Sequence, residues 1–206
     1  MNPDQILPLF TAPDGTYHFA RWRRPIAPVV FGVQDQTLAL VKGALVTVAG
    51  LAGHTMAETD PEQGANLMIF FLRDWDELSE IPDLDRLVPQ LTGRAARLSH
   101  ADADHYRQFR YEADGAIRAA FVFVRMSARL TGLPADDLAL DLALRVILPF
   151  QAAALRHHPA LLHQEKGSVI APSVADLIRV AYDPILPVAA TDHSHALRLS
   201  ARLLSE

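Results

Sequence analysis

Hydrophobic and polar positions along the chain follow two periods, one typical of strands and one typical of helices. The apolar run NLMIFFL at residues 66–72 lies between turn residues and predicts a buried strand. The run IAPVVFG at residues 26–32 predicts a second strand, and its Pro28 favours an edge position because proline cannot donate to a neighbouring strand. Residues 105–126 predict a β-hairpin, since Asp-Gly at positions 114–115 is a common hairpin turn.

Helical spacing of apolar residues marks three further segments. Residues 33–53 carry apolar side chains three or four positions apart and predict one helix. A longer helix is predicted over residues 136–158, and Pro149 is expected to kink or interrupt it. Residues 171–184 predict another helix with Ser173 as its N-cap.

The remaining segments predict shorter or looser structure. Residues 1–15 are rich in Pro and Asp and are expected to form a loosely attached N-terminal segment. Residues 16–22 predict a short edge strand. Residues 73–91 predict one or two short surface helices broken at their prolines, and residues 192–204 predict a short amphipathic helix that closes the chain.

The order of these elements predicts an α+β fold. We expect a mixed, mostly antiparallel sheet with a long central helix and C-terminal helices. The first strand–helix–strand unit is expected to contribute one parallel pair of strands. The length fits a single domain over residues 1–206, because a domain commonly holds about 100–200 residues.

Composition narrows the classes of function. The chain is 50% hydrophobic, and a net charge of −5 with one short basic run, RWRR at 21–24, offers no basic patch, so we expect no nucleic-acid partner. The chain has no cysteine, which excludes disulfides, thiolate catalysis and cysteine metal sites. No apolar run reaches the roughly 18 residues of a membrane span, and the N-terminus lacks a secretory signal. We therefore expect a cytoplasmic protein without a membrane partner.

Common catalytic and cofactor motifs are missing from the sequence. It contains no Gly-x-x-x-x-Gly-Lys, no Gly-x-Gly-x-x-Gly and no Gly-x-Ser-x-Gly. We therefore expect no cofactor.

One acid and one base interrupt the apolar stretch DDLALDLALRVILPFQ at residues 136–151. Asp141 and Arg145 are four positions apart, so on a helix they lie on one face and can neutralise each other. If both are buried, desolvation makes the pair costly and demands a further reason. The alternative is that they remain from a former active site, now a pocket that binds without cleaving.

Four stretches of the chain carry a resemblance to a known family. They are FARWRRPIAPVVFG, NLMIFFL, the predicted helix at 136–158, and IAPSVADLIRVAYDPIL with Asp176, Tyr182, Asp183 and Pro184 in matching places. Over roughly residues 18–187 the chain resembles an uncharacterised bacterial domain family related to zincin-like metalloproteases. The resemblance implies a sheet with an antiparallel edge strand, followed by a long active-site helix.

The chain departs from zincins at the metal site. Zincins bind zinc through His-Glu-x-x-His on one helix, with the Glu as general base. That motif is absent, and the candidate helix reads LDLALRVIL instead. Asp141 could stand where a carboxylate is needed, but Leu144 is no ligand and Arg145 would repel a cation. The resemblance therefore implies a zincin-like fold without the usual zinc site.

Histidine is the strongest remaining metal-ligating residue type. The candidate ligands are His157, His158, His163, His193 and His195. The alternative interpretation is structural, with polar helix ends or an exposed helix start. The loop SHADADHY at residues 99–106 resembles a calcium loop only superficially, because the Gly and the closing Glu are missing, and a solvated loop is the alternative.

These patterns lead to one hypothesis and two rivals. We expect a non-catalytic binding domain, a pseudo-peptidase, that receives a peptide or protein partner in a cleft between sheet and long helix. The cleft candidates are Asp141, Arg145, Tyr182 and Trp75, although Trp75 could instead cap the edge of the core. The first rival is a metal-dependent peptidase or hydrolase using the histidines above. The second is a structural subunit whose apolar surface forms a homo-oligomer interface.

Overall fold

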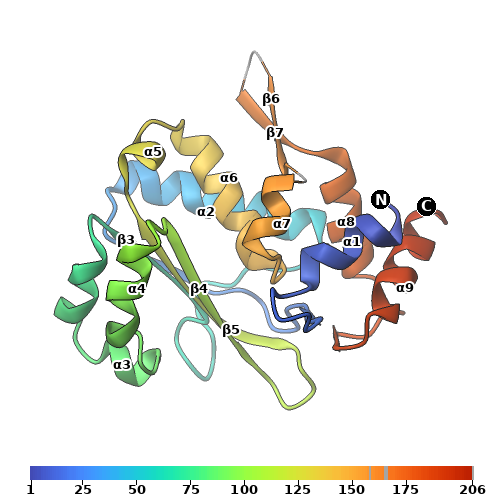
Figure 1. The fold of residues 1–206 in the computed structure, drawn as a ribbon, viewed down its shortest axis with the longest axis horizontal. Helices are drawn as coiled ribbons and strands as arrows, with labels where there is room; N and C mark the ends of the chain where they lie inside the picture. The colour runs from blue at the N-terminus through green and yellow to red at the C-terminus, as the bar shows by residue number, and fades with distance from the viewer. Residues whose placement is uncertain (158, 165–166, 206) are drawn as a thin grey trace.

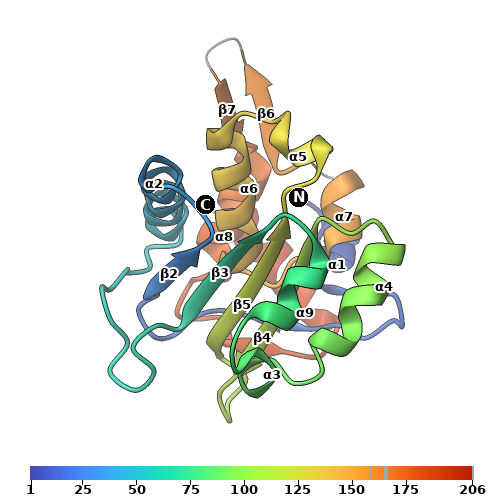
Figure 2. The same cartoon turned by 90° about the vertical axis from the view of Figure 1, so that its left-hand side faces the viewer.

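A four-stranded sheet is the centre of the fold (Figure 2). The computed structural model describes residues 1–157, 159–164 and 167–205. The strands are β2 (Pro28–Phe31), β3 (Leu67–Leu72), β5 (Ile117–Arg125) and β4 (His105–Tyr111), in the spatial order β2-β3-β5-β4. The predicted strands and the hairpin are confirmed, as is the edge position of Pro28.

The directions of the strands correct one expectation. The pairs β2–β3 and β3–β5 are parallel, and only β4–β5 is antiparallel. A mixed sheet is confirmed, but a mostly antiparallel one is wrong for this sheet. The reason is the position of the hairpin, because β5 inserts beside β3 and leaves β4 at the edge. The parallel pair expected from the first strand–helix–strand unit is present.

Helix α2 (Asp35–Leu51) connects β2 to β3 and confirms the predicted helix. Gly32 turns the chain between strand and helix at φ +79, in the left-handed region that favours glycine. A Cβ at this position would overlap the backbone carbonyl of Phe71 in the neighbouring strand. The buried face of α2 packs against the next long helix, α6.

The expected helix over residues 136–158 is two helices. Helix α6 (Ala135–Ile147) ends where Leu148 becomes extended, and α7 (Ala152–His157) follows. The break lies at Pro149, which has no N–H to donate and disfavours a helical conformation in the residue before it. Residue 158 lies outside the described residues.

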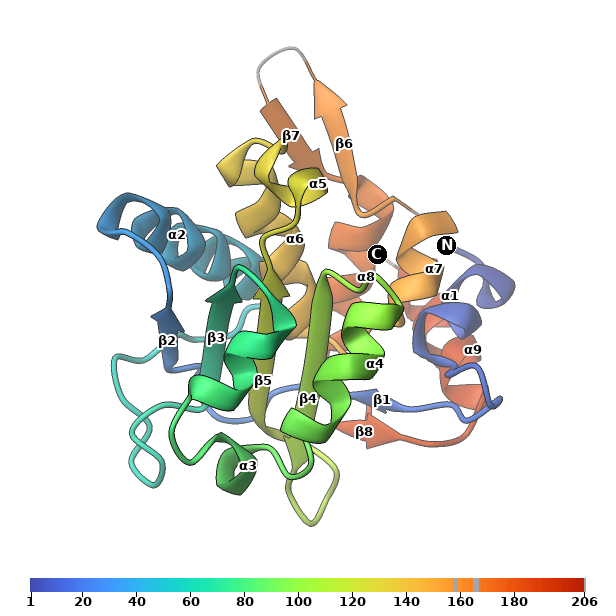
Figure 3. The same ribbon diagram turned by 60° about the vertical axis from the view of Figure 1, so that its left-hand side comes forward.

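Helices cover both faces of the sheet (Figures 2 and 3). Helices α2 and α6 lie on one face, over the larger hydrophobic core. A short 3-10 helix η1 (Trp75–Glu80), helix α3 (Leu84–Leu87), a 3-10 turn η2 (Thr92–Arg94) and helix α4 (Ala95–His100) lie on the other, over a second core. The short helices expected in the segment 73–91 are confirmed.

The N-terminal segment is packed, not loose. Helix α1 (Pro3–Phe10) begins with a capping box between Asn2 and Gln5, and it buries Ile6, Leu9 and Phe10. The expectation of a loosely attached segment is therefore wrong for this helix. One proline is its first residue and Pro8 lies inside it, and the apolar side of the helix faces the core. Figure 1 shows the two chain ends close together.

Helix α1 packs against elements from the C-terminal third of the chain. Helix α8 (Pro172–Ala181) confirms the predicted helix, but its N-cap is Ala171 and not Ser173. Helix α9 (Ser194–Leu203) packs on α1 and α8. Strand β1 (Phe19–Ala20) is as short as expected, but it pairs with β8 (Ala189–Ala190) in a separate two-stranded sheet.

A short helix and a pair of short strands complete the described chain. Helix α5 (Ala128–Thr131) precedes α6. Strands β6 (Leu161–Gln164) and β7 (Gly167–Ile170) are paired antiparallel and project from the body of the molecule (Figure 1). None of the helices in the described ranges has the length and apolar character needed to cross a membrane.

Candidate functional site

The free edge of β4 is the first element of the candidate site. The amide of Arg125 donates to the carbonyl of Asp104 at 2.8 Å, which sets the alternation of the antiparallel ladder. Residues 106, 108 and 110 therefore bond to β5, whereas His105, Arg107 and Phe109 direct their N–H and C=O groups away from the sheet. This edge can accept another strand.

Two hollows adjoin this edge and share His105. One has a volume of about 490 Å³ and the other about 300 Å³. The first is lined by Asp104, His105, Arg129, Leu133, Asp141 and Arg145, and the second by His18, His105, Arg107, Phe109, Tyr111 and Phe150. We call the two together the β4 groove. One wall is the edge strand, and the opposite wall is α6 with the segment that follows it.

Asp141 and Arg145 lie in this groove and form the ion pair that their spacing predicts. Arg145 Nε donates to Asp141 Oδ2 at 2.6 Å. The side chains are 26% and 16% exposed, so the pair keeps part of its hydration. The desolvation that complete burial would impose is therefore limited. The pair presents both signs of charge to the groove within one helical turn.

His105 lies beside this pair without joining it. Its Nε2 is 4.0 Å from Asp141 Oδ2 and has no hydrogen-bond partner among the described residues. Burial, followed by the positive charge of Arg145, lowers the pKa of His105 to about 4. The imidazole is therefore neutral near pH 7, and its contact with Asp141 is not an ion pair.

Arg107 joins the edge strand to the opposite wall. Its guanidinium donates to the carbonyl of Arg145 and to the carbonyl of Phe150, the latter at 2.5 Å. Carbonyls in the last turn of a helix lack partners within the helix, so Arg107 satisfies one at the end of α6. Burial and the nearby Arg145 lower the pKa of Arg107 to about 10, which leaves it charged.

The loop before β4 closes one end of the groove. Asp104 is buried and accepts hydrogen bonds from Arg125 at 3.3 Å and from Arg129. Arg125 also bonds to Asp102, which is largely exposed. The expectation of a solvated loop is therefore wrong for Asp104, because two arginines hold it against the sheet.

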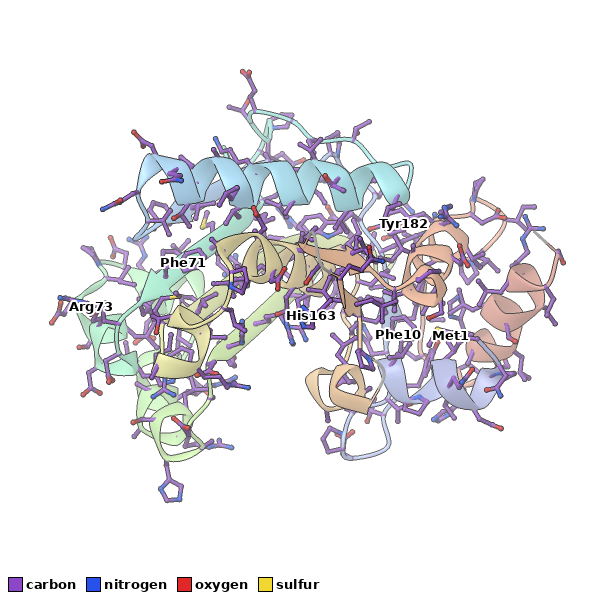
Figure 4. All side chains as sticks on the ribbon, turned by 90° about the horizontal axis from the view of Figure 1, so that it is seen from above. Met1, Phe10, Phe71, Arg73, His163 and Tyr182 are labelled. Atoms are coloured by element: carbon purple, nitrogen blue, oxygen red, sulfur yellow. The ribbon has the colours of Figure 1, made fainter. Side chains whose placement is uncertain are left out.

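The other two cleft candidates lie elsewhere. Trp75 is completely buried, and its Nε1 donates to the carbonyl of Ala103 at 2.8 Å. It is thus a residue of the second core, as the alternative interpretation held. Tyr182 donates to the carbonyl of Ile147 at 2.8 Å, and it lies at the far end of α2 from Phe71 (Figure 4). It lines a separate hollow of about 420 Å³.

The candidate metal ligands do not converge in the described part of the chain. His163 is exposed on β6 and bonds to Ser168 at 2.7 Å, His193 is exposed at the start of α9, and His195 is buried against Tyr17 at 3.1 Å. An exposed helix start is therefore wrong for His195, which faces the core side of α9. The side chain of His157, and all of His158, lie outside the described residues. Residues 1–157, 159–164 and 167–205 contain no group of three or more His, Cys, Asp or Glu that could hold a metal ion.

Two arginines that line the groove, Arg107 and Arg129, were not among the sequence candidates. Arg107 alternates with His105 and Phe109 along β4, a period of two that places all three on one face of the strand. Arg129 comes from α5, and nothing in its local sequence indicates its partner.

Comparisons with family models, with curated proteins and with solved structures found no match for this chain.

Proposed function

We propose that this chain is a non-catalytic binding domain that receives an extended segment of a partner protein along β4. The observation that carries the proposal is the open edge of β4, which forms one wall of the β4 groove. Added strands gain affinity from main-chain hydrogen bonds and specificity from pockets for alternate side chains.

The outward backbone groups set the length of the ligand. His105, Arg107 and Phe109 offer donors and acceptors at every second position. An added strand that bonds to all three needs about five residues, given the two-residue repeat of a strand. Alternate side chains of such a ligand would point towards the two hollows.

The two hollows favour different side chains. The end near α5 and α6 presents Asp141, Arg145 and Arg129, which suits a polar or charged side chain. The end near α7 presents the rings of Phe109 and Tyr111 together with polar groups, which suits an aromatic side chain that carries a polar atom. We therefore expect the ligand to carry a charged residue and an aromatic residue such as tyrosine on the same side of its strand.

One feature supports extending the proposal to the zincin-like fold that the sequence resemblance implies. An antiparallel edge strand precedes a helix, α6, and the groove lies between them. In this proposal the domain is a pseudo-peptidase, because Arg145 places a positive charge where a zinc site would need ligands.

A peptide selection tests the proposal. Linear twelve-residue peptides from a random displayed library are selected on the wild-type protein, and the affinity of each selected peptide is measured by fluorescence polarisation. His105→Pro removes an outward N–H at the first residue of the strand, where proline is tolerated. His105→Ala is the matched control, because it removes the imidazole and keeps the N–H.

The two variants have different expected results. The loss of one main-chain hydrogen bond should make His105→Pro bind about fivefold more weakly than His105→Ala. Equal affinities for the two variants would contradict strand addition at β4. Cleavage of a selected peptide by the metal-loaded protein, detected by mass spectrometry, would contradict the non-catalytic assignment and favour the hydrolase.

A further inference from the structure

Another groove, which is largely apolar, lies on the opposite edge of the sheet from the β4 groove. It has a volume of about 640 Å³ and is lined by Phe31, Met68, Phe70, Ile81, Glu77 and Glu80, among others. We call it the β2 groove. It exists because η1, α3 and α4 cover the strands from β3 to β4 and leave β2 uncovered on this face (Figure 2).

Aromatic rings form the floor of the β2 groove. Phe31 is 45% exposed and stacks on Phe70, with ring centroids 4.8 Å apart. Phe70 in turn stacks on Phe123 at 4.9 Å. The three stacked rings therefore run from an exposed ring on β2 into the second core. A ligand that covers Phe31 would extend this existing core.

The edge of β2 cannot bind its partner as β4 is proposed to do. The carbonyl of Ala27 accepts from Leu67 on β3, so in this parallel pair the backbone groups of residues 28 and 30 point outward. Pro28 has no N–H, which leaves Val30 as the single outward donor of the four-residue strand. The occupant must be held by side chains.

Charge at the rim specifies the kind of side chain. Two of the six acidic residues in the segment 73–85, Glu77 and Glu80, line the groove. Arg73 extends into solvent at the margin of the molecule and pairs with Glu77 (Figure 4). Glu80 is exposed and makes no ion pair within the described residues. The groove therefore suits a helix that combines apolar and basic side chains.

Such a helix is present on the surface of the same chain. Leu197 on α9 is 58% exposed, Leu204 at the C-cap of this helix is 87% exposed, and exposed Ala201 lies between them at helical spacing. Exposed Arg198 flanks this stripe, and the buried residues of α9 lie on its other side. We call Leu197, Ala201 and Leu204 the α9 stripe.

We infer that the β2 groove of one copy of this chain receives the α9 stripe of a second copy. The two surfaces differ and lie at opposite ends of the long axis, with β3 and α3 at one end and α9 at the other (Figure 1). Such a head-to-tail contact leaves one groove and one stripe unoccupied at the ends, so further copies are added until the assembly closes into a ring or continues as an open chain. One ten-residue helix buries less than the roughly 1,200 Å² of a stable interface, so the association is weak.

Complementary variants test this arrangement by sedimentation velocity, from about 10 µM to about 1 mM protein, a range that covers weak association. The wild type should form species larger than a dimer as concentration rises. Phe31→Asp blocks only the groove and Leu197→Asp blocks only the stripe, so each should remain monomeric. Their mixture should form a complex with one copy of each, because one functional groove and one functional stripe remain. Ile185→Asp, which changes a 77% exposed residue outside both surfaces, should associate like the wild type.

A second pair of variants keeps the test valid if Phe31→Asp disturbs β2. Glu80→Arg should weaken self-association up to about fivefold, and adding Arg198→Glu in the same chain should restore it. A wild type that stays monomeric throughout would overturn the inference. A mixture of the two aspartate variants that forms no complex would also overturn it. So would a double variant Glu80→Arg and Arg198→Glu that associates no better than Glu80→Arg alone. These variants lie outside the β4 groove, so their failure leaves the proposed peptide site unaffected.

Discussion

Arg107 on the edge strand donates a hydrogen bond to the carbonyl of Phe150 at 2.5 Å, and a second one to the carbonyl of Arg145. The two carbonyls lie before and after the break between α6 and α7. One side chain therefore holds the strand and the interrupted helix at a fixed separation. That separation forms the β4 groove.

Removing this arginine should cost stability. Arg107→Met leaves two carbonyls without their donors, and each unsatisfied buried group costs about 1–3 kcal/mol, so we expect a loss of about 2–6 kcal/mol in the free energy of unfolding. Urea unfolding at pH 7 measures it. Arg23→Met is the control, since Arg23 is 62% exposed in its ion pair and should change stability by less than about 1 kcal/mol. Equal losses in the two variants would contradict the role of Arg107.

The ion pair between Asp141 and Arg145 should contribute only modestly to the free energy of unfolding. Because both side chains keep solvent contact, a double-mutant cycle with Asp141→Asn and Arg145→Gln should give a coupling energy of about 0.5–1 kcal/mol. Urea unfolding of the four proteins measures the cycle. A coupling of several kcal/mol would mean that the pair is effectively desolvated, and no coupling would mean that the pair does not form in solution.

Two buried histidines should make stability depend on pH. Burial lowers the pKa of both His105 and His195 to about 4, well below the ordinary value of about 6.5 for histidine. The unfolded state therefore gains its protons first as pH falls, so this contribution is complete above about pH 6.5 and declines towards pH 4. As the pH falls from 6.5 to about 5, each histidine should lower the free energy of unfolding by up to about 2 kcal/mol.

Urea unfolding at a series of pH values measures this slope. The double variant His105→Gln and His195→Gln should show a shallower decline, because glutamine does not titrate, and His18 and His54, whose pKa values burial also lowers, should supply the decline that remains. A wild-type stability that stays level between pH 6.5 and pH 5 would contradict the burial of these rings in solution.

Two glycines should respond in opposite directions to the same substitution. Gly32→Ala places a Cβ against the Phe71 carbonyl at a positive φ, so we expect a loss of more than about 1 kcal/mol. Gly43→Ala lies within α2, where a Cβ meets nothing within 4 Å, and should gain about 0.5–1 kcal/mol. Thermal unfolding of the two variants measures both changes. Stabilisation by Gly32→Ala would contradict the turn between β2 and α2.

Local patterns predict the elements of this fold better than their pairing. The apolar run of β3 and the Asp-Gly turn of the hairpin are recognisable because a buried strand and a tight turn restrict residue types locally. The insertion of β5 beside β3 depends on contacts between distant segments, which no local period encodes. The N-terminal helix was missed for another reason, since its prolines suggest a loop although Pro3 begins the helix.

The candidate site is predictable only where its partners are close in sequence. Asp141 and Arg145 follow from helical spacing, and the structure pairs them. The approach of Arg107 to the end of α6 spans 38 residues, so the sequence gives no sign of it. Trp75 and Tyr182 are large residues with polar atoms, and such residues serve equally well in a core when a carbonyl accepts their hydrogen.

Amide hydrogen exchange, measured residue by residue along β4 by NMR, is the most direct test of strand addition at this edge. A selected peptide that adds as a strand should protect the outward amides of His105, Arg107 and Phe109. The amides of Tyr106, Gln108 and Arg110 already bond to β5 and should change little. Protection that alternates in this way would establish strand addition at the β4 edge. Saturating peptide without new protection at the three outward amides would contradict it.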